Sequence, residues 1–176
     1  MTSSLSLARR VRPYEKLTGS SFRSECRFLD FVIDGRSLLE MMSERNFGNA
    51  DMASVLWLAP TLDDDDAVGR LLGRSASPLD DGRIPLYVCP ECGDLGCGAL
   101  TVVLEISSGQ VIWRDPGWQT DYEDEVHYED FADISPFVFD RAQYEAVLST
   151  VSEFHAREEK DAPAKEPAPW WMWWRR

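Results

Sequence analysis

The stretch IPLYVCPECGDLGCGALTVVLEISSGQVIWR spans residues 84–114, and the prediction of the fold starts from it. Three parts of it, residues 84–89, 99–106 and 110–114, are rich in the β-branched, aliphatic and aromatic side chains that favour strands. Ser107, Ser108 and Gly109 form a short turn sequence between the last two of these parts. We therefore expect neighbouring antiparallel strands here.

Further elements flank this predicted sheet. Ser37 and Asp140 each precede a segment of helical character and are suitable N-cap residues, and Glu40 completes a capping box with Ser37. The expected elements are a strand over residues 27–33 and helices over residues 38–44, 67–73 and 141–160, while residues 137–139 are expected to be either a last short strand or a docking segment. The fold class that follows is α+β, with a mostly antiparallel sheet, two to three helices and a disordered C-terminal extension.

Length and charge indicate one domain with additions at both ends. The chain has 176 residues and a net charge of −13, but residues 28–150 alone contain seven arginines and 24 acidic residues, a net charge of −17. Residues 1–27 carry +4. We expect a flexible basic arm over residues 1–21, an acidic α+β domain over 22–158, a Pro/Ala/charged linker over 159–169 and a Trp/Arg-rich tail over 170–176.

The same composition excludes several classes of protein. No apolar run approaches the roughly 18 residues that a transmembrane helix needs. A strongly acidic domain lacks the clustered cations that bind nucleic acid. The first residues do not have the order of charged and apolar segments of a signal peptide, so we expect a cytoplasmic protein with reduced cysteines.

Cys89, Cys92 and Cys97 make the clearest candidate site. A C-x2-C pair in a turn between strands can present two thiolates to one zinc ion, and Cys97 adds a third sulfur nearby. The fourth ligand is not local, and the candidates for it are Cys26, His127, Asp94 and His155. Two other interpretations stay open: reduced cysteines acting as small apolar residues in a glycine-rich turn, and redox chemistry.

A resemblance covers most of residues 28–150. The segments IPLYVCPECGDLGCGALTVVLE and VIWRDPGWQTDYE, with the weaker elements FVIDGRSLLEMM and FVFDRAQYEAVL, resemble a family of small uncharacterised actinobacterial proteins. The resemblance implies a compact α+β domain in a bacterial cytosol and supplies no reaction.

The tail is the second unusual feature: Trp170, Trp171, Met172, Trp173, Trp174, Arg175 and Arg176. An exposed aromatic segment marks a binding surface or an aggregation hazard. It can fold back on the acidic domain, anchor the chain to a membrane or partner, or be a product. In the last case the layout resembles a ribosomally synthesised, post-translationally modified peptide precursor, with a leader domain and a Trp-rich core.

The functional hypothesis that we favour from the sequence is a non-enzymatic carrier. In it, the folded leader domain presents residues 170–176 to peptide-modifying enzymes, because a tethered core is held at high effective concentration near an enzyme that docks on the domain. The alternative is a zinc-stabilised protein-interaction or immunity-type module whose tail docks on itself, a partner or a membrane. No catalytic group is predicted, since neither histidine has a serine nucleophile motif near it.

Overall fold

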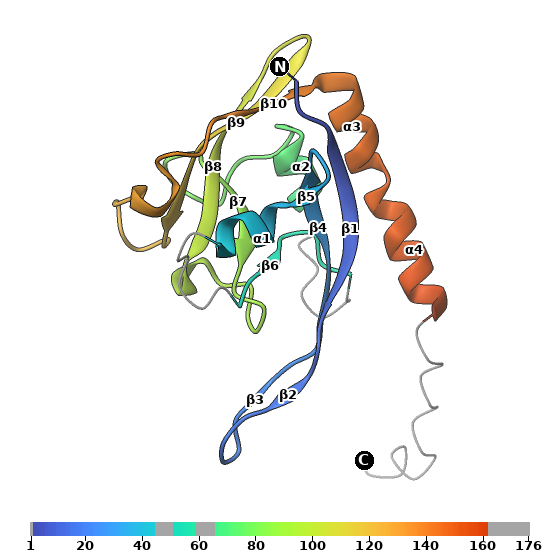
Figure 1. The fold of residues 1–176 in the computed structure, drawn as a ribbon, viewed down its shortest axis with the longest axis vertical. Helices are drawn as coiled ribbons and strands as arrows, with labels where there is room; N and C mark the ends of the chain where they lie inside the picture. Colours follow the sequence, from blue (N-terminus) through green and yellow to red (C-terminus); the bar gives the residue numbers. More distant parts are fainter. Residues whose placement is uncertain (1, 45–50, 59–65, 162–176) are drawn as a thin grey trace, which may run out of the picture.

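The computed structural model describes residues 2–44, 51–58 and 66–161. The expected α+β class with mostly antiparallel sheets is confirmed. Five strands form the larger sheet in the order β10-β9-β8-β7-β6, and three form a second sheet in the order β1-β4-β5 (Figure 1). The linker predicted over residues 159–169 begins too early, because residues 159–161 belong to the last helix, α4 (Val151–Asp161). The rest of the linker, the tail predicted over 170–176 and the predicted disorder there lie outside the described residues.

The larger sheet grows from the hairpins that the sequence predicts. Its strands are β6 (Ala53–Ser54), β7 (Ile84–Val88), β8 (Ala99–Ile106), β9 (Gln110–Gln119) and β10 (Phe137–Asp140). All of its pairs are antiparallel. The third predicted strand ends at residue 114, whereas β9 runs five residues further through a register shift at Asp115 and Pro116. The extension is possible because Arg83 is buried beside this irregularity and donates to the Asp115 carbonyl.

The second sheet corrects the prediction for the N-terminus. The flexible arm predicted over residues 1–21 is wrong for residues 5–12, because β1 (Leu5–Arg12) pairs with β4 (Cys26–Ile33) over eight successive positions. The short strands β2 (Glu15–Lys16) and β3 (Phe22–Arg23) continue this pair as a hairpin, and β5 (Arg36–Ser37) lies on the other edge of β4. The β1 strand has no apolar alternation because Arg10 and Arg12 occupy inward positions, where each meets a carboxylate.

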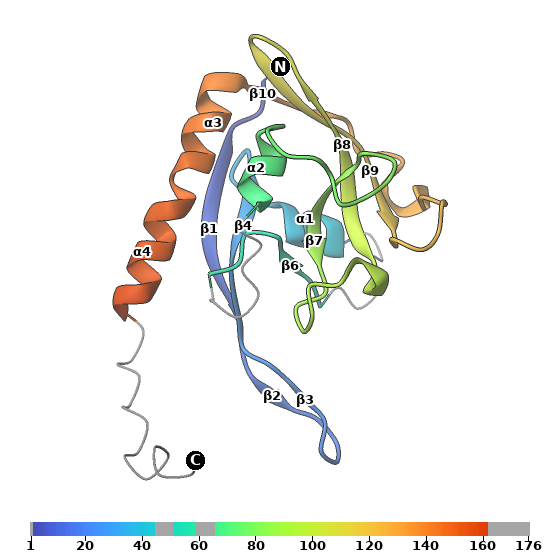
Figure 2. The same cartoon turned by 180° about the vertical axis from the view of Figure 1, so that it is seen from behind.

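Helices cover the sheets at three places. Helix α1 (Leu38–Ser43) begins at Ser37, whose hydroxyl accepts from the Glu40 backbone N–H. Helix α2 (Ala67–Leu71) is short, and the carbonyl of its last residue, Leu71, accepts from the Tyr144 hydroxyl. Helices α3 (Arg141–Ser149) and α4 (Val151–Asp161) run along β1 (Figures 1 and 2), and Tyr144 of α3 also packs against Trp113 of β9 in the larger sheet. The sequence predicts one helix here. The structure interrupts it at Thr150, because the Ser149 and Thr150 hydroxyls donate back to the Ala146 and Val147 carbonyls.

The core lies between the two sheets. Phe31 of β4 packs edge-on against Tyr87 of β7 and Trp113 of β9, with ring centroids 5.8 and 5.2 Å apart. All three side chains are fully buried. Residues 55–58 connect the sheets through the backbone, since Leu29 N–H donates to the Leu56 carbonyl and Val55 N–H to the Leu86 carbonyl.

A buried carboxylate joins the same elements. Asp30 of β4 is fully buried and accepts hydrogen bonds from the hydroxyls of Tyr87 (2.5 Å) and Ser37 (2.6 Å). The oxygen that accepts from Ser37, Oδ2, also lies 3.0 Å from Nε of Arg10 on β1. Burial, reinforced by the Asp30 charge, holds the pKa of Tyr87 well above 10, so its hydroxyl stays a donor.

This network predicts the effect of Tyr87→Phe. Removing the hydroxyl takes one donor from a buried carboxylate, so we expect the free energy of unfolding to fall by about 1.5–3 kcal/mol in urea titrations. Tyr122→Phe is the matched control, because Tyr122 is 70% exposed and should change stability by less than about 0.5 kcal/mol. Equal unfolding midpoints for the two variants would contradict this account of the core.

Candidate metal centre

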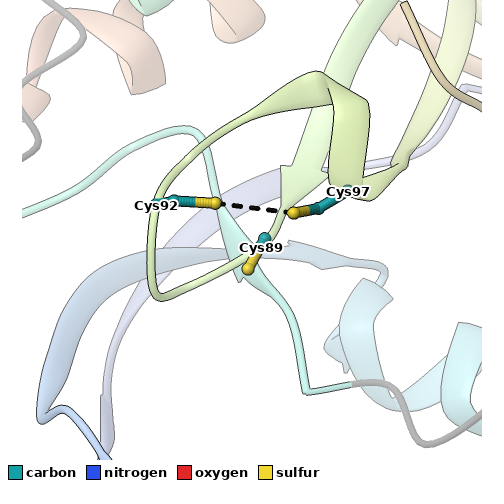
Figure 3. Close-up of side chains that lie close together, drawn as sticks. All are labelled: Cys89, Cys92 and Cys97. Atoms are coloured by element: carbon teal, nitrogen blue, oxygen red, sulfur yellow. Dashed lines mark hydrogen bonds between the residues drawn. The ribbon is translucent and has the colours of Figure 1, made fainter.

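Three cysteines gather at one end of the β7–β8 connection. Cys89 follows β7, Cys92 lies in the turn, and Cys97 ends the single 3₁₀ turn η1 (Leu95–Cys97) that leads into β8. Their sulfur atoms all lie within 4.8 Å of one another, and those of Cys92 and Cys97 are 3.6 Å apart. Figure 3 shows the Cys92 and Cys97 sulfurs facing each other, with the Cys89 side chain beside them. The prediction that these three cysteines lie close together is therefore confirmed.

The local backbone explains why the sulfurs meet. Gly93 has φ +67°, a left-handed conformation that glycine adopts without strain, and its N–H donates to the Cys89 carbonyl. This bond closes the turn and carries Cys92 back toward Cys89. Asp94 then caps η1 by accepting from the Gly96 N–H at 2.7 Å, which sets the position of Cys97.

The cluster is accessible to solvent. Cys92 and Cys97 are exposed and Cys89 is half-buried. The hydrogen bond with Cys92, reinforced by the charge of Cys89, raises the pKa of Cys97 to about 11. A bound cation would reverse this effect, because metal binding replaces the thiol protons and compensates the repulsion among the thiolates.

The candidates for a fourth ligand do not join the cluster. In the described part of the chain, no other His, Cys, Asp or Glu has its ligand atom within 4.8 Å of all three sulfurs. Cys26 belongs to the core, and burial raises its thiol pKa to about 12. The backbone of His127 pairs with Trp118, the Asp94 carboxylate caps η1, and His155 lies on α4, on the opposite side of β1.

Two neighbouring residues that the sequence analysis overlooked support the cysteine turn. Gly98 follows Cys97 with φ +95°, and a Cβ built there would lie 1.9 Å from the Trp118 ring, so the indole packs directly on the glycine. Glu91 lies between Cys89 and Cys92, and its Oε1 accepts from the Arg12 guanidinium at 2.7 Å. The sequence shows Gly98 directly after Cys97 and Glu91 inside the C-P-E-C motif, so both positions could be singled out. Their partners, Trp118 and Arg12, are distant in the sequence and could not be identified from it.

The Gly98 contact predicts a local defect in Gly98→Ala. The added methyl must displace the Trp118 ring and would force alanine into a strained φ, so we expect a loss of about 2–4 kcal/mol in the free energy of unfolding. Gly109→Ala is the control, since Gly109 has no atom within 4 Å of its Cβ position and no positive φ. The assignment fails if both variants unfold at the same denaturant concentration.

The tail residues 170–176, which the sequence marks as a core peptide, lie outside the described residues. Within the described residues, no helix is long and apolar enough to cross a membrane. Comparison of the chain with protein-family models, curated proteins and solved structures finds no match.

Proposed function

We propose that the chain is a non-catalytic, zinc-binding module of the bacterial cytoplasm that holds one ion at Cys89, Cys92 and Cys97. The observation that carries this proposal is the convergence of three sulfur atoms within 4.8 Å of one another. Thiolate sulfur is a preferred ligand of Zn²⁺, and the turn with its left-handed glycine already brings three of them together. Water or a group from outside the described residues completes the tetrahedral coordination.

The charge of the ligands favours a binding role over a catalytic one. Three thiolates exceed the +2 charge of the ion, so a water in the fourth position is less strongly polarised than one on zinc held by neutral imidazoles. A reducing compartment suits the site, because it keeps Cys92 and Cys97, whose sulfurs are 3.6 Å apart, from being oxidised to a disulfide.

Zinc binding by the full chain tests this function. The reduced protein should bind one Zn²⁺ per chain in competition with a chromophoric chelator, and Cys92→Ser should weaken the binding at least about tenfold, because it replaces a thiolate with a neutral hydroxyl. Cys26→Ala is the control and should keep wild-type affinity. Absence of bound zinc in the wild type, or equal loss in both variants, would contradict the proposal.

A second candidate function is the carrier role for the tail, with peptide-modifying enzymes as partners. One structural observation supports it: α4, the last described element, is attached to the body, since Glu158 contacts Arg9 of β1 and Arg27 of β4 at 2.9 and 2.7 Å. A helix held in this way gives the following residues a fixed starting point beside the domain, which favours their presentation to an enzyme docked there.

Mass spectrometry of protein isolated from the native host tests the carrier role. Trypsin cleavage after Lys165 separates all four tail tryptophans from the domain. We expect this peptide to differ in mass from its sequence, by the loss of hydrogens if indoles are cross-linked, and the difference to disappear when the four tail tryptophans are replaced by alanine. An unmodified peptide would exclude the carrier role and leave the zinc site unaffected.

A further inference from the structure

A hairpin projects from the body of the molecule with little packing to hold it. Within the described residues, strands β2 and β3 pair only with each other, at Glu15↔Arg23 and Lys16↔Phe22, and both views show them extending beyond the second sheet (Figures 1 and 2). Tyr14 and Phe22 stack on each other with centroids 5.9 Å apart, yet they are 58% and 56% exposed. We name residues 13–24 the projecting hairpin. Its position therefore depends on the contacts at its base.

Those contacts come from Arg12, whose Nη1 donates to the Ser24 carbonyl at 2.9 Å, and from two carboxylates. Asp51 lies 2.6 Å from Nε of Arg12 and 3.3 Å from Nε of Arg23, on the two sides of the base. Glu91 also bridges both sides, because its Oε1 accepts from Nη2 of Arg12 at 2.7 Å and from the backbone N–H of Ser24 at 3.0 Å. Arg12 is largely covered, with 11% of its side chain exposed, so it provides a fixed attachment.

Glu91 belongs to the cysteine turn itself, between the two sulfurs of C-P-E-C. Without a metal, the turn is held by backbone hydrogen bonds and by the contact between the Cys92 and Cys97 sulfurs. The Glu91 side chain then loses conformational entropy each time its carboxylate binds Arg12 and Ser24. A metal bonded to Cys89 and Cys92 fixes the chain on both sides of Glu91. The loss of conformational entropy when the carboxylate binds the hairpin base is then smaller.

We propose that metal binding at the three cysteines orders the projecting hairpin through Glu91. The inference rests on the proposed zinc site and adds a consequence to it: the exposed Tyr14 and Phe22 rings are held in place when the metal is bound and move more freely when it is absent. Because coupling between two events is reciprocal, the hairpin contacts must also strengthen metal binding by the same factor.

Amide hydrogen exchange of the full reduced chain, with and without Zn²⁺, measures this coupling. We expect zinc to slow exchange in the projecting hairpin by about fivefold or more beyond any change in α3, whose amides report overall stability. In Glu91→Ala this additional protection should disappear, while the turn itself still responds to zinc. Glu25→Gln is the matched control: Glu25 is next to Ser24 and pairs with Arg27, so the variant should behave as the wild type.

Zinc affinity, measured by chelator competition, separates the possible failures. Glu91→Ala should lower zinc affinity by the same factor by which it reduces the zinc-dependent slowing of exchange in the projecting hairpin, and by no more. Zinc binding by the wild type without added hairpin protection would overturn the coupling and leave the zinc site intact. Retained protection in Glu91→Ala, or complete loss of its zinc binding, would also overturn the coupling. Failure of the wild type to bind zinc would overturn both proposals.

Discussion

The buried carboxylate of Asp30 is the interaction on which the arrangement of the two sheets depends. It receives hydroxyl hydrogen bonds from Tyr87 on β7 and from Ser37 at the start of α1, and it pairs with Arg10 on β1. A charge in the core is tolerated only where such donors surround it, so the carboxylate specifies which elements must meet. Ser37 transmits the constraint further, because the same hydroxyl caps α1 through the Glu40 N–H. One side chain thus sets the position of two strands and the start of a helix relative to β4.

The separation of charge along the chain has a structural cause as well. The arginines of β1 are directed to acids that come much later in the sequence: Arg9 contacts Glu158, Arg10 contacts Asp30, and Arg12 contacts Asp51 and Glu91. The basic first segment therefore neutralises part of an acidic domain at the places where its own strand must pack. This explains why a strand without an apolar alternation is stable at this position, and why its charges cannot be regarded as a solvated arm.

How far the sequence could predict the structure follows from the range of the interactions involved. The strand at residues 99–106 and the caps at Ser37 and Asp140 depend on neighbouring residues, and the sequence predicts them with nearly the observed bounds. The β1 strand was missed because its stability comes from carboxylates on other elements. The cysteine cluster was found from its spacing, since its ligands lie within one turn, whereas the roles of Asp30 and Glu91 depend on partners that no local pattern identifies.

The short spacing of the cysteines also limits what a metal can do for this fold. Cys89, Cys92 and Cys97 enclose a loop of only about nine residues, and the entropy lost on closing a loop grows with the logarithm of its length. An unfolded chain can therefore bring the same three sulfurs to an ion at modest cost, and a ligand that also binds the unfolded state stabilises the fold less. The main effect of zinc should then be local. In the folded chain Glu91 extends the turn to another part of the molecule, because its carboxylate accepts from Arg12 and Ser24 at the base of the projecting hairpin. This base is therefore where we expect metal binding to have its largest structural consequence.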